Sequence, residues 1–178
     1  MGVICKYKYD SSIYADLIPE FNSGYSGYVI TDEVEGNIIT RTIESDKLPI
    51  SMRFGRFYVQ GESATDNRTD SLLEVLDMNT SGLTSCSHMF RYNTNLTSIN
   101  CKWDTSNVTT MNEMFRGCSS LTSLDVSGFD TSKVTSMRFT FNGCNSLTEL
   151  DLSNFDTSNV TNMSHMFVNC SKLTSLDL

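Results

Sequence analysis

The side chains best suited to chemistry in this chain are its cysteines and histidines, which can bind metals or act as nucleophile and base. The chain has 6 cysteines and 2 histidines. Cys118, Cys144 and Cys170 follow one another at intervals of 26 residues. A zinc site needs several ligands that converge on one point, and one cysteine per interval does not provide them. The spacing instead predicts a column of small, buried, free thiols, and we expect no metal and no cofactor.

The two histidines do not suggest catalysis either. His88 and His165 both stand in Ser-His-Met-Phe, and Glu113 and Phe139 fill the same position in between. A position that accepts such different side chains is tolerant, and we expect it to be exposed. Histidines so far apart in a repeat cannot share a proton, and the sequence has no phosphate-binding glycine loop or nucleophile elbow. We therefore expect no catalytic residue and no enzyme activity.

Aspartates form two further columns. The first precedes Thr-Ser and comprises Asp104, Asp130 and Asp156. An aspartate there accepts a hydrogen bond from a backbone N–H two or three residues on and closes a turn. The second column lies between core leucines and comprises Asp125, Asp151 and Asp177. Carboxylates that point outward from adjacent strands repel one another, so this column is either a site for a ligand or a cation such as calcium, or solvated surface.

These columns arise from an internal repeat. The segment from Leu121 to Met137 returns from Leu147 to Met163, and earlier copies begin at Leu96 and, more faintly, at Met78. The period lies within the range of about 20 to 29 residues of leucine-rich repeats, whose Leu-x-x-Leu-x-Leu strand motif it also carries. Each unit should form one coil of a solenoid, with strands about 4.8 Å apart in a parallel ladder. The recurring phenylalanines and methionines should fill its core.

Polar side chains that alternate with the core leucines would line the outer face of this ladder. We predict that this sheet face binds the ligand, a protein or a glycan. The predicted ligand-binding residues are Ser98, Asn100, Lys102, Ser123, Asp125, Ser127, Glu149, Asp151, Ser153, Ser175 and Asp177.

The segment before the repeats has a different composition and holds both prolines. Strands are expected over 3–9 and 51–59, and a hairpin over 27–44 turned at Glu35-Gly-Asn37. A short helix that ends around Pro19 is expected within 12–21, and the polar residues 61–71 are typical of a connector.

The predicted fold class is therefore mainly β. A small β-rich domain at 1–71 caps the first coil or docks to a larger assembly, and a short leucine-rich-repeat solenoid of about four coils, each of 25 to 26 residues, occupies 72–178.

The repeat from Leu150 to Cys170, Leu-Asp-Leu-Ser-Asn-Phe-Asp-Thr-Ser-Asn-Val-Thr-Asn-Met-Ser-His-Met-Phe-Val-Asn-Cys, resembles the BspA-like leucine-rich repeats of bacterial surface proteins. The resemblance covers residues 72–178 and implies adhesion or recognition on the surface of Firmicutes, mycoplasmas and related organisms. The N-terminal segment is similar to the leaders of prophage-encoded structural proteins of Firmicutes. That similarity implies a place on a phage particle.

Composition limits the classes of partner. A net charge of -8 disfavours nucleic acid and anionic membranes, and no apolar stretch is long enough to insert into a membrane. No signal peptide is recognisable at the start. We expect a non-enzymatic recognition or structural protein on a phage-like particle or tail, located on a virion or an extracellular surface; the alternative is a bacterial surface adhesin. The uncapped strand at 173–178 should be covered, either by a neighbouring subunit or partner or by a continuation of the array. We expect a homo-oligomer or larger assembly through this strand, the N-terminal domain or both.

Overall fold

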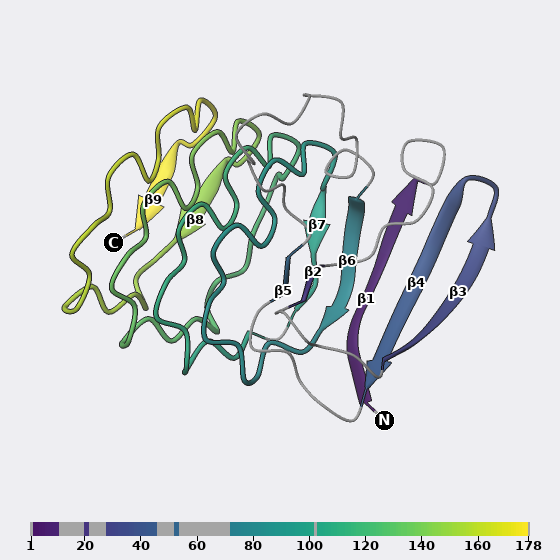
Figure 1. Ribbon diagram of the computed structural model, residues 1–178. Coiled ribbons are helices and arrows are strands. Elements are labelled where there is room, and N and C mark those ends of the chain that lie inside the picture. Colours follow the sequence, from purple (N-terminus) through teal and green to yellow (C-terminus); the bar gives the residue numbers. More distant parts are fainter. Residues whose placement is uncertain are drawn as a thin grey trace, which may run out of the picture.

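The computed structural model describes residues 2–10, 20–21, 28–45, 52–53, 72–101 and 103–177 (Figure 1). This part of the chain is mainly β and contains no helix, and so none that could cross a membrane. The strands are β1 (Gly2–Asp10), β2 (Glu20–Phe21), β3 (Val29–Glu35), β4 (Ile38–Ser45), β5 (Met52–Arg53), β6 (Leu72–Met78), β7 (Ser98–Ile99), β8 (Glu149–Asp151) and β9 (Ser175–Asp177).

Five of these strands form one mixed sheet in the order β3-β4-β1-β6-β7. Strands β3 and β4 make the hairpin that the sequence predicts, and Gly36 allows its tight turn because it adopts a φ of 62°. Asp32 and Arg41 join the two strands through paired hydrogen bonds of 2.7 and 2.6 Å. Strand β1 confirms the strand predicted over 3–9, and its inward side chains include Tyr7, which is fully buried.

Two other N-terminal predictions lie largely outside the described residues. Of the range 12–21, in which a helix is expected, only Glu20–Phe21 is described, and this pair forms strand β2. Strand β2 pairs antiparallel with β5, the described part of the strand expected over 51–59. The expected helix ends around Pro19, so the part of the chain that it would occupy lies outside the described residues. The connector at 61–71 lies wholly outside the described residues.

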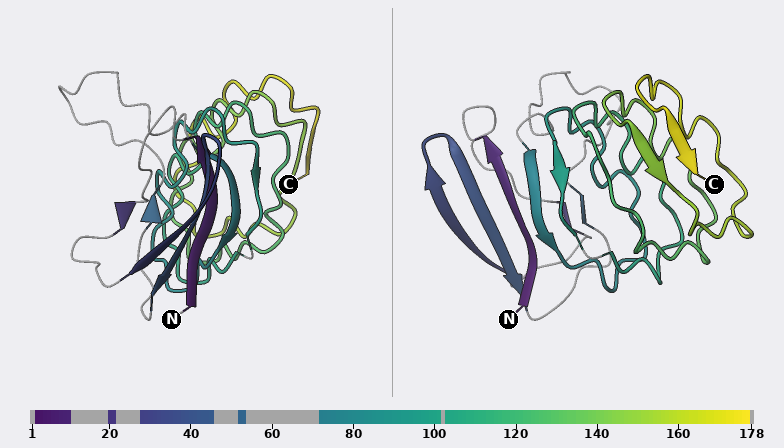
Figure 2. Two further views of the ribbon diagram at one scale, coloured as in Figure 1. Left: turned by 90° about the vertical axis from the view of Figure 1, so that its right-hand side faces the viewer. Right: turned by 180° about the vertical axis from the view of Figure 1, so that it is seen from behind.

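The N-terminal strands and the repeats share one sheet and one core. Strand β1 pairs antiparallel with β6, the first strand of the repeat region, with Tyr7 opposite Val75. Tyr7, Tyr9 and Ile43 belong to the same cluster of buried side chains as the leucines and phenylalanines of the repeats. Figure 2 shows the repeats continuing the row that the N-terminal strands begin. The first repeat is thereby covered on the side of β1.

The repeats stack as successive coils, which we number coil 1 (72–95), coil 2 (96–120), coil 3 (121–146) and coil 4 (147–172), followed by the start of a fifth at 173–177. A column of threonines connects them. The backbone N–H of Thr109 donates to the carbonyl of Thr84, that of Thr135 to Thr109 and that of Thr161 to Thr135, at 3.0, 2.9 and 2.9 Å. Each threonine hydroxyl bonds to the same carbonyl as its own N–H. Every coil is therefore tied to the next.

The main coil-to-coil ladder is not where the sequence predicts it. Strands β6 and β7 pair in parallel, as do β8 and β9, but the Leu-x-x-Leu-x-Leu segment of coil 3 forms no strand. The continuous ladder instead follows the Met-x-x-Met-Phe segment. There the N–H groups of Met111, Glu113, Phe115 and Gly117 donate to coil 3 at 3.0, 2.9, 2.9 and 2.7 Å, and the same pattern joins coil 1 to coil 2 and coil 3 to coil 4.

Left-handed backbone conformations make this ladder possible. The equivalent residues His88, Glu113, Phe139 and His165 have φ values of 63°, 57°, 58° and 61°. A left-handed residue changes the direction of the chain without breaking the row of N–H groups that face the next coil. Such a conformation is uncommon outside glycine, so the residue types at this position do not predict it.

The core consists of side-chain columns, as the sequence predicts. The rings of Phe90, Phe115, Phe141 and Phe167 stack with centroids 5.7, 5.6 and 5.8 Å apart and nearly parallel planes. Met111 and Met137 are fully buried, whereas Met163 in coil 4 is 48% exposed, because no further described coil covers it. The prediction of a buried methionine column is therefore correct for the inner coils and wrong for the last one.

All six cysteines are free, and three of them form the predicted column. The Sγ atoms of Cys118 and Cys144 are buried and donate to the carbonyls of Phe90 and Phe115 at 3.0 and 3.2 Å. Cys170 is half-buried and makes the same bond to Phe141. The thiols thus fill small spaces in the core and also satisfy carbonyl groups of the preceding coil.

Candidate functional site

The structure places the predicted sheet-face residues on the outside of the coils. Ser98 lies on β7, Glu149 and Asp151 on β8, and the other described members lie in β9 or in the irregular segments between strands. The nine whose burial is described are all exposed: Ser98, Asn100, Ser123, Asp125, Ser127, Glu149, Asp151, Ser153 and Ser175. Lys102 and the side chain of Asp177 lie outside the described residues.

Four of these residues meet at one recess. A cavity of about 140 Å³ is lined by Leu124, Asp125, Val126, Ser127, Asp151, Ser153 and Asn154. The cavity lies next to the residues that directly follow the leucine segments of coil 3 and coil 4. Equivalent side chains of the two coils therefore face the same space. Asn154 holds the two coils together here, because its Nδ2 donates to the carbonyls of Val126, Ser127 and Phe129.

Both carboxylates at the recess are fixed by their own turns. Asp125 accepts a hydrogen bond of 2.9 Å from the N–H of Ser127, and Asp151 accepts one of 2.9 Å from the N–H of Ser153. Hydrogen bonds from the hydroxyl and N–H groups of these serines hold the pKa of each aspartate below its ordinary value. The two side chains are therefore ionised at neutral pH. The serine N–H groups orient them.

The other aspartate column closes turns, as predicted. Asp104, Asp130 and Asp156 each accept a hydrogen bond from the N–H of the serine two residues on, at 3.2, 3.0 and 2.9 Å. Asn79 makes the same bond to Ser81 in coil 1. These residues therefore have a structural role at the corner of each coil. Within the described residues, no group of three or more His, Cys, Asp or Glu side chains is arranged to hold a metal ion.

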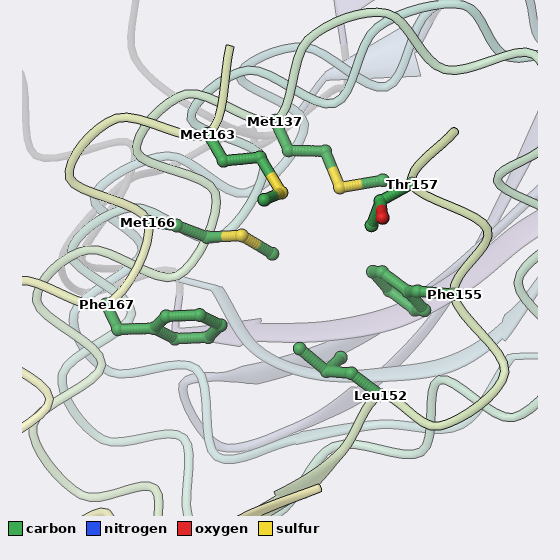
Figure 3. Close-up of a pocket in the computed structure, with 7 residues that line it drawn as sticks. All are labelled: Met137, Leu152, Phe155, Thr157, Met163, Met166 and Phe167. Carbon is green, nitrogen blue, oxygen red and sulfur yellow. The ribbon is translucent and has the colours of Figure 1, made fainter. Parts of the chain in front are cut away.

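A second cavity lies at the end of the core in coil 4. It has a volume of about 420 Å³ and is lined by Met137, Leu152, Phe155, Thr157, Met163, Met166 and Phe167, whose side chains point into it in Figure 3. Apart from the Thr157 hydroxyl, these side chains are apolar. The same core positions in the inner coils are covered by the next coil. The cavity therefore offers mainly apolar contact area.

The histidine position differs from the expectation of a tolerant, exposed site. Only His165 is exposed, whereas His88, Glu113 and Phe139 are half-buried. Glu113 is held by two arginines: Arg116 donates to its Oε2 at 2.9 Å, and the Nε of Arg91 lies 2.9 Å from the same oxygen. The left-handed backbone directs the side chains at this position along the coil surface, where they contact side chains of neighbouring coils.

Sequence reasoning missed the surface around Glu113. Arg91, Arg116 and Arg138 gather there with Tyr92, Phe139 and His165. Phe139 and His165 stack with ring centroids 4.7 Å apart, and guanidinium groups lie over the rings of Tyr92 and Phe139. The Met-Phe-Arg sequence shared by coils 1 and 2 was the available signal, but Arg138 comes from a different repeat position.

Fold and sites together describe a mainly β protein built from stacked sequence repeats with exposed polar columns. Comparison with known families adds one match, to the family described as "Mycoplasma protein of unknown function, DUF285", over residues 62–177. The chain belongs to this family. No curated protein and no solved structure matches the chain.

Proposed function

We propose that the chain is a non-enzymatic recognition protein whose coils, a leucine-rich-repeat solenoid of the BspA-like type, present a binding face. The observation that carries this proposal is the recess between coil 3 and coil 4, where Asp125 and Asp151 from equivalent positions face one space. A repeat that stacks its coils places the same side chain along a line, and such lines form extended binding surfaces.

The size of the recess supports recognition of a large ligand. Sites that enclose small molecules measure roughly 300 to 1,000 Å³, whereas this recess holds about 140 Å³. Two ionised carboxylates and two serines suit one hydroxyl-bearing or cationic group of a larger partner, such as a sugar of a glycan or a lysine of a protein. The remaining exposed polar residues of the face would contact the rest of that partner.

Two settings fit a recognition protein of this kind. The N-terminal segment favours a phage-like particle or tail, located on a virion. The family, described from Mycoplasma, supports the alternative of a bacterial cell-surface adhesin, since mycoplasmas are among the organisms that the BspA-like resemblance implies. Assembly into a homo-oligomer through the N-terminal strands or the open coil end would raise the strength of binding through several weak contacts.

The test is a double charge reversal, Asp125→Lys with Asp151→Lys. Labelled protein is applied to arrays of surface glycans and of purified extracellular proteins, and circular dichroism checks that the variant folds. We expect the double variant to lose the binding that the unchanged protein shows. The matched control, Glu33→Lys with Glu35→Lys, makes the same charge change on the exposed strand β3 and should bind normally. Equal binding by the first variant, or no binding by the unchanged protein, would contradict the proposal.

A further inference from the structure

The outer face of coil 4 repeats a surface that the next coil covers in each inner coil. Phe167 stacks on Phe141 with ring centroids 5.8 Å apart, and it is half-buried whereas Phe141 is fully buried. Met163 is 48% exposed, whereas Met137, its equivalent in coil 3, is 0% exposed. We call this surface the coil 4 end face and define it by Thr157, Thr161, Met163, His165, Phe167 and Asn169. Two columns of the core are therefore covered on one side only at this face.

The same face carries a row of backbone donors. In each inner coil, four N–H groups at alternate positions donate to carbonyls of the next coil, as the N–H of Met137 does to Asn162 at 2.8 Å. The equivalent N–H groups of coil 4 have no acceptor among the described residues, and they belong to Met163, His165, Phe167 and Asn169. His165 and Asn169 have left-handed φ values of 61° and 63°, as the equivalent residues of the inner coils do. A molecule bound here must therefore supply a row of acceptors.

Two threonines of the face lack the partners of their equivalents. The carbonyl of Thr135 accepts the N–H and the hydroxyl of Thr161, but the carbonyl of Thr161 meets no such donor in the described part of the chain. The hydroxyl of Thr131 donates to the carbonyl of Asp156 at 3.0 Å, and Thr131 is buried. Thr157 is exposed, and its hydroxyl has no hydrogen bond within the described ranges. The bound molecule must also supply a donor for Thr161 and an acceptor for Thr157.

These acceptors and donors occur in one order along a single segment of this chain. Residues 130–142 of coil 3 bind the equivalent groups of coil 2. The carbonyl of Asp130 accepts the hydroxyl of Thr105 at 2.9 Å, and the N–H and hydroxyl of Thr135 donate to coil 2. Four carbonyls at alternate positions after Thr135 accept the N–H row. The coil 4 end face thus continues an interface that the chain already forms between its coils, and it fits the same kind of segment.

We propose that the coil 4 end face binds a polypeptide coil of the same repeat, supplied by a partner protein. The carbonyls of that coil accept the N–H row, and its threonine donates to the carbonyl of Thr161. Its aromatic ring stacks on Phe167, and its methionine side chains enter the cavity of about 420 Å³ beside Met163 (Figure 3). Main-chain hydrogen bonds then give affinity, and the cavity gives specificity for the side chains.

This contact uses a different surface from the recess at Asp125 and Asp151. The recess lies between coil 3 and coil 4 and is lined by polar side chains of both, whereas the coil 4 end face lies on the side of coil 4 away from coil 3. The proposal therefore stands or fails independently of the function proposed above.

The test uses a fluorescent peptide of residues 130–143 as the probe and the full chain as the receptor. Its sequence is Asp-Thr-Ser-Lys-Val-Thr-Ser-Met-Arg-Phe-Thr-Phe-Asn-Gly. Fluorescence anisotropy measures binding to protein diluted until sedimentation shows a monomer. We expect this peptide to bind saturably and a peptide of the same residues in scrambled order not to bind. Met163→Gln should weaken binding roughly tenfold, because the interface loses the burial of one methionine side chain.

Amide hydrogen exchange locates the contact on the protein. The amide protons of His165, Phe167 and Asn169 should exchange more slowly when the peptide is bound, because they then donate to its carbonyls. The amide protons of strand β3, at the other end of the described sheet, should exchange at the same rate with and without the peptide.

A matched variant in the same coil controls for a general loss of apolar surface. Val168→Gln changes a side chain that is 42% exposed but does not line the cavity, and it should leave binding unchanged. Circular dichroism checks that both variants fold. The proposal is overturned if the peptide does not bind, if the scrambled peptide binds as tightly, or if Val168→Gln weakens binding as much as Met163→Gln. Oligomers of the chain that the peptide cannot disperse would also overturn it, since a second copy would then hold the face.

Discussion

The Sγ atom of Cys144 donates a hydrogen bond of 3.2 Å to the carbonyl oxygen of Phe115, one coil earlier. Cys118 and Cys170 make the equivalent bonds to Phe90 and Phe141. Burial raises the pKa of Cys144 to about 12 and that of Cys170 above its ordinary value. The column is therefore protonated at physiological pH, and its thiols act as small donors within the core.

This protonation predicts the order in which the thiols react. Without reductant, the unfolded protein should titrate all six thiols. In the folded protein at mildly alkaline pH, Cys170 should react before Cys118 and Cys144, because it is half-buried while they are buried. Mass spectrometry after timed alkylation measures the order. Recovery of only two or four thiols, or labelling of Cys118 as fast as Cys170, would contradict this account of the column.

Asn93 occupies the cysteine position in coil 1 and predicts a stabilising substitution. It is 0% exposed, and its side-chain nitrogen and oxygen have no hydrogen-bond partner among the described residues. A buried unsatisfied amide costs roughly 1 to 3 kcal/mol, so Asn93→Cys should raise the free energy of unfolding by about 1 to 2 kcal/mol in urea denaturation.

The reverse exchange provides the control for Asn93. Cys144→Asn would place the same amide in an inner coil, where it should lower the free energy of unfolding by about 2 kcal/mol or more. A loss of stability in Asn93→Cys would show that the amide has a polar partner after all.

The repeat architecture was predictable because its signals are local and recur. The aspartate turns, the cysteine column and the phenylalanine stack all follow from one residue type at one position in every coil. The position of the main ladder could not be predicted, because the Leu-x-x-Leu-x-Leu motif is typical of a strand. The left-handed backbone at Glu113 and Phe139 was not predictable either, since neither residue is a glycine. Burial of those two side chains was missed for the same reason.

The surface around Glu113, where three arginines gather, was not predicted for a different reason. Arg116 follows Glu113 by three residues, whereas Arg138 immediately precedes Phe139, the residue equivalent to Glu113. These positions are unrelated within the repeat and meet only when coils 2 and 3 stack. The sheet-face residues, by contrast, could be expected to be exposed from strand alternation alone, although coil 3 forms no strand there.

The corner aspartates predict a loss of stability in acid. Hydrogen bonds from the hydroxyl and N–H of Ser132 hold the pKa of Asp130 below its ordinary value. The folded pKa thus lies below the unfolded value of about 3.9. The stabilisation is fully present above the unfolded pKa and is lost as pH falls through the folded pKa. The melting temperature should therefore fall as pH drops below about 4.

Asp130→Asn isolates this contribution. Asn79 accepts the same backbone bond at 3.0 Å in coil 1, so the amide should keep the turn but remove the titrating group. The variant should melt near the unchanged protein at acid pH and show a weaker pH dependence in thermal scans. An identical pH dependence in both proteins would show that Asp130 contributes nothing to the acid effect.

The open core end predicts association of this chain in solution. The cavity of about 420 Å³ at coil 4 is lined mainly by apolar side chains, among them the exposed Met163, and Leu176 on β9 is exposed as well. Burial of such a surface against a second molecule is favourable. Sedimentation at micromolar concentration should show oligomers, and Met163→Gln with Leu176→Gln should shift the chain towards monomer. A well-behaved monomer for the unchanged chain would argue against this contact.

The threonine column has a mechanical consequence. The hydrogen bonds of Thr84, Thr109, Thr135 and Thr161 join each coil to its immediate neighbours, so a pulling force applied to the chain end meets one set of these bonds at a time. Coils should detach singly, and each release of some 26 residues would lengthen the tether by about 90 Å. A molecule anchored at one end would unfold one coil at a time under load and refold each coil when the tension drops. The stack would then act as an extensible tether.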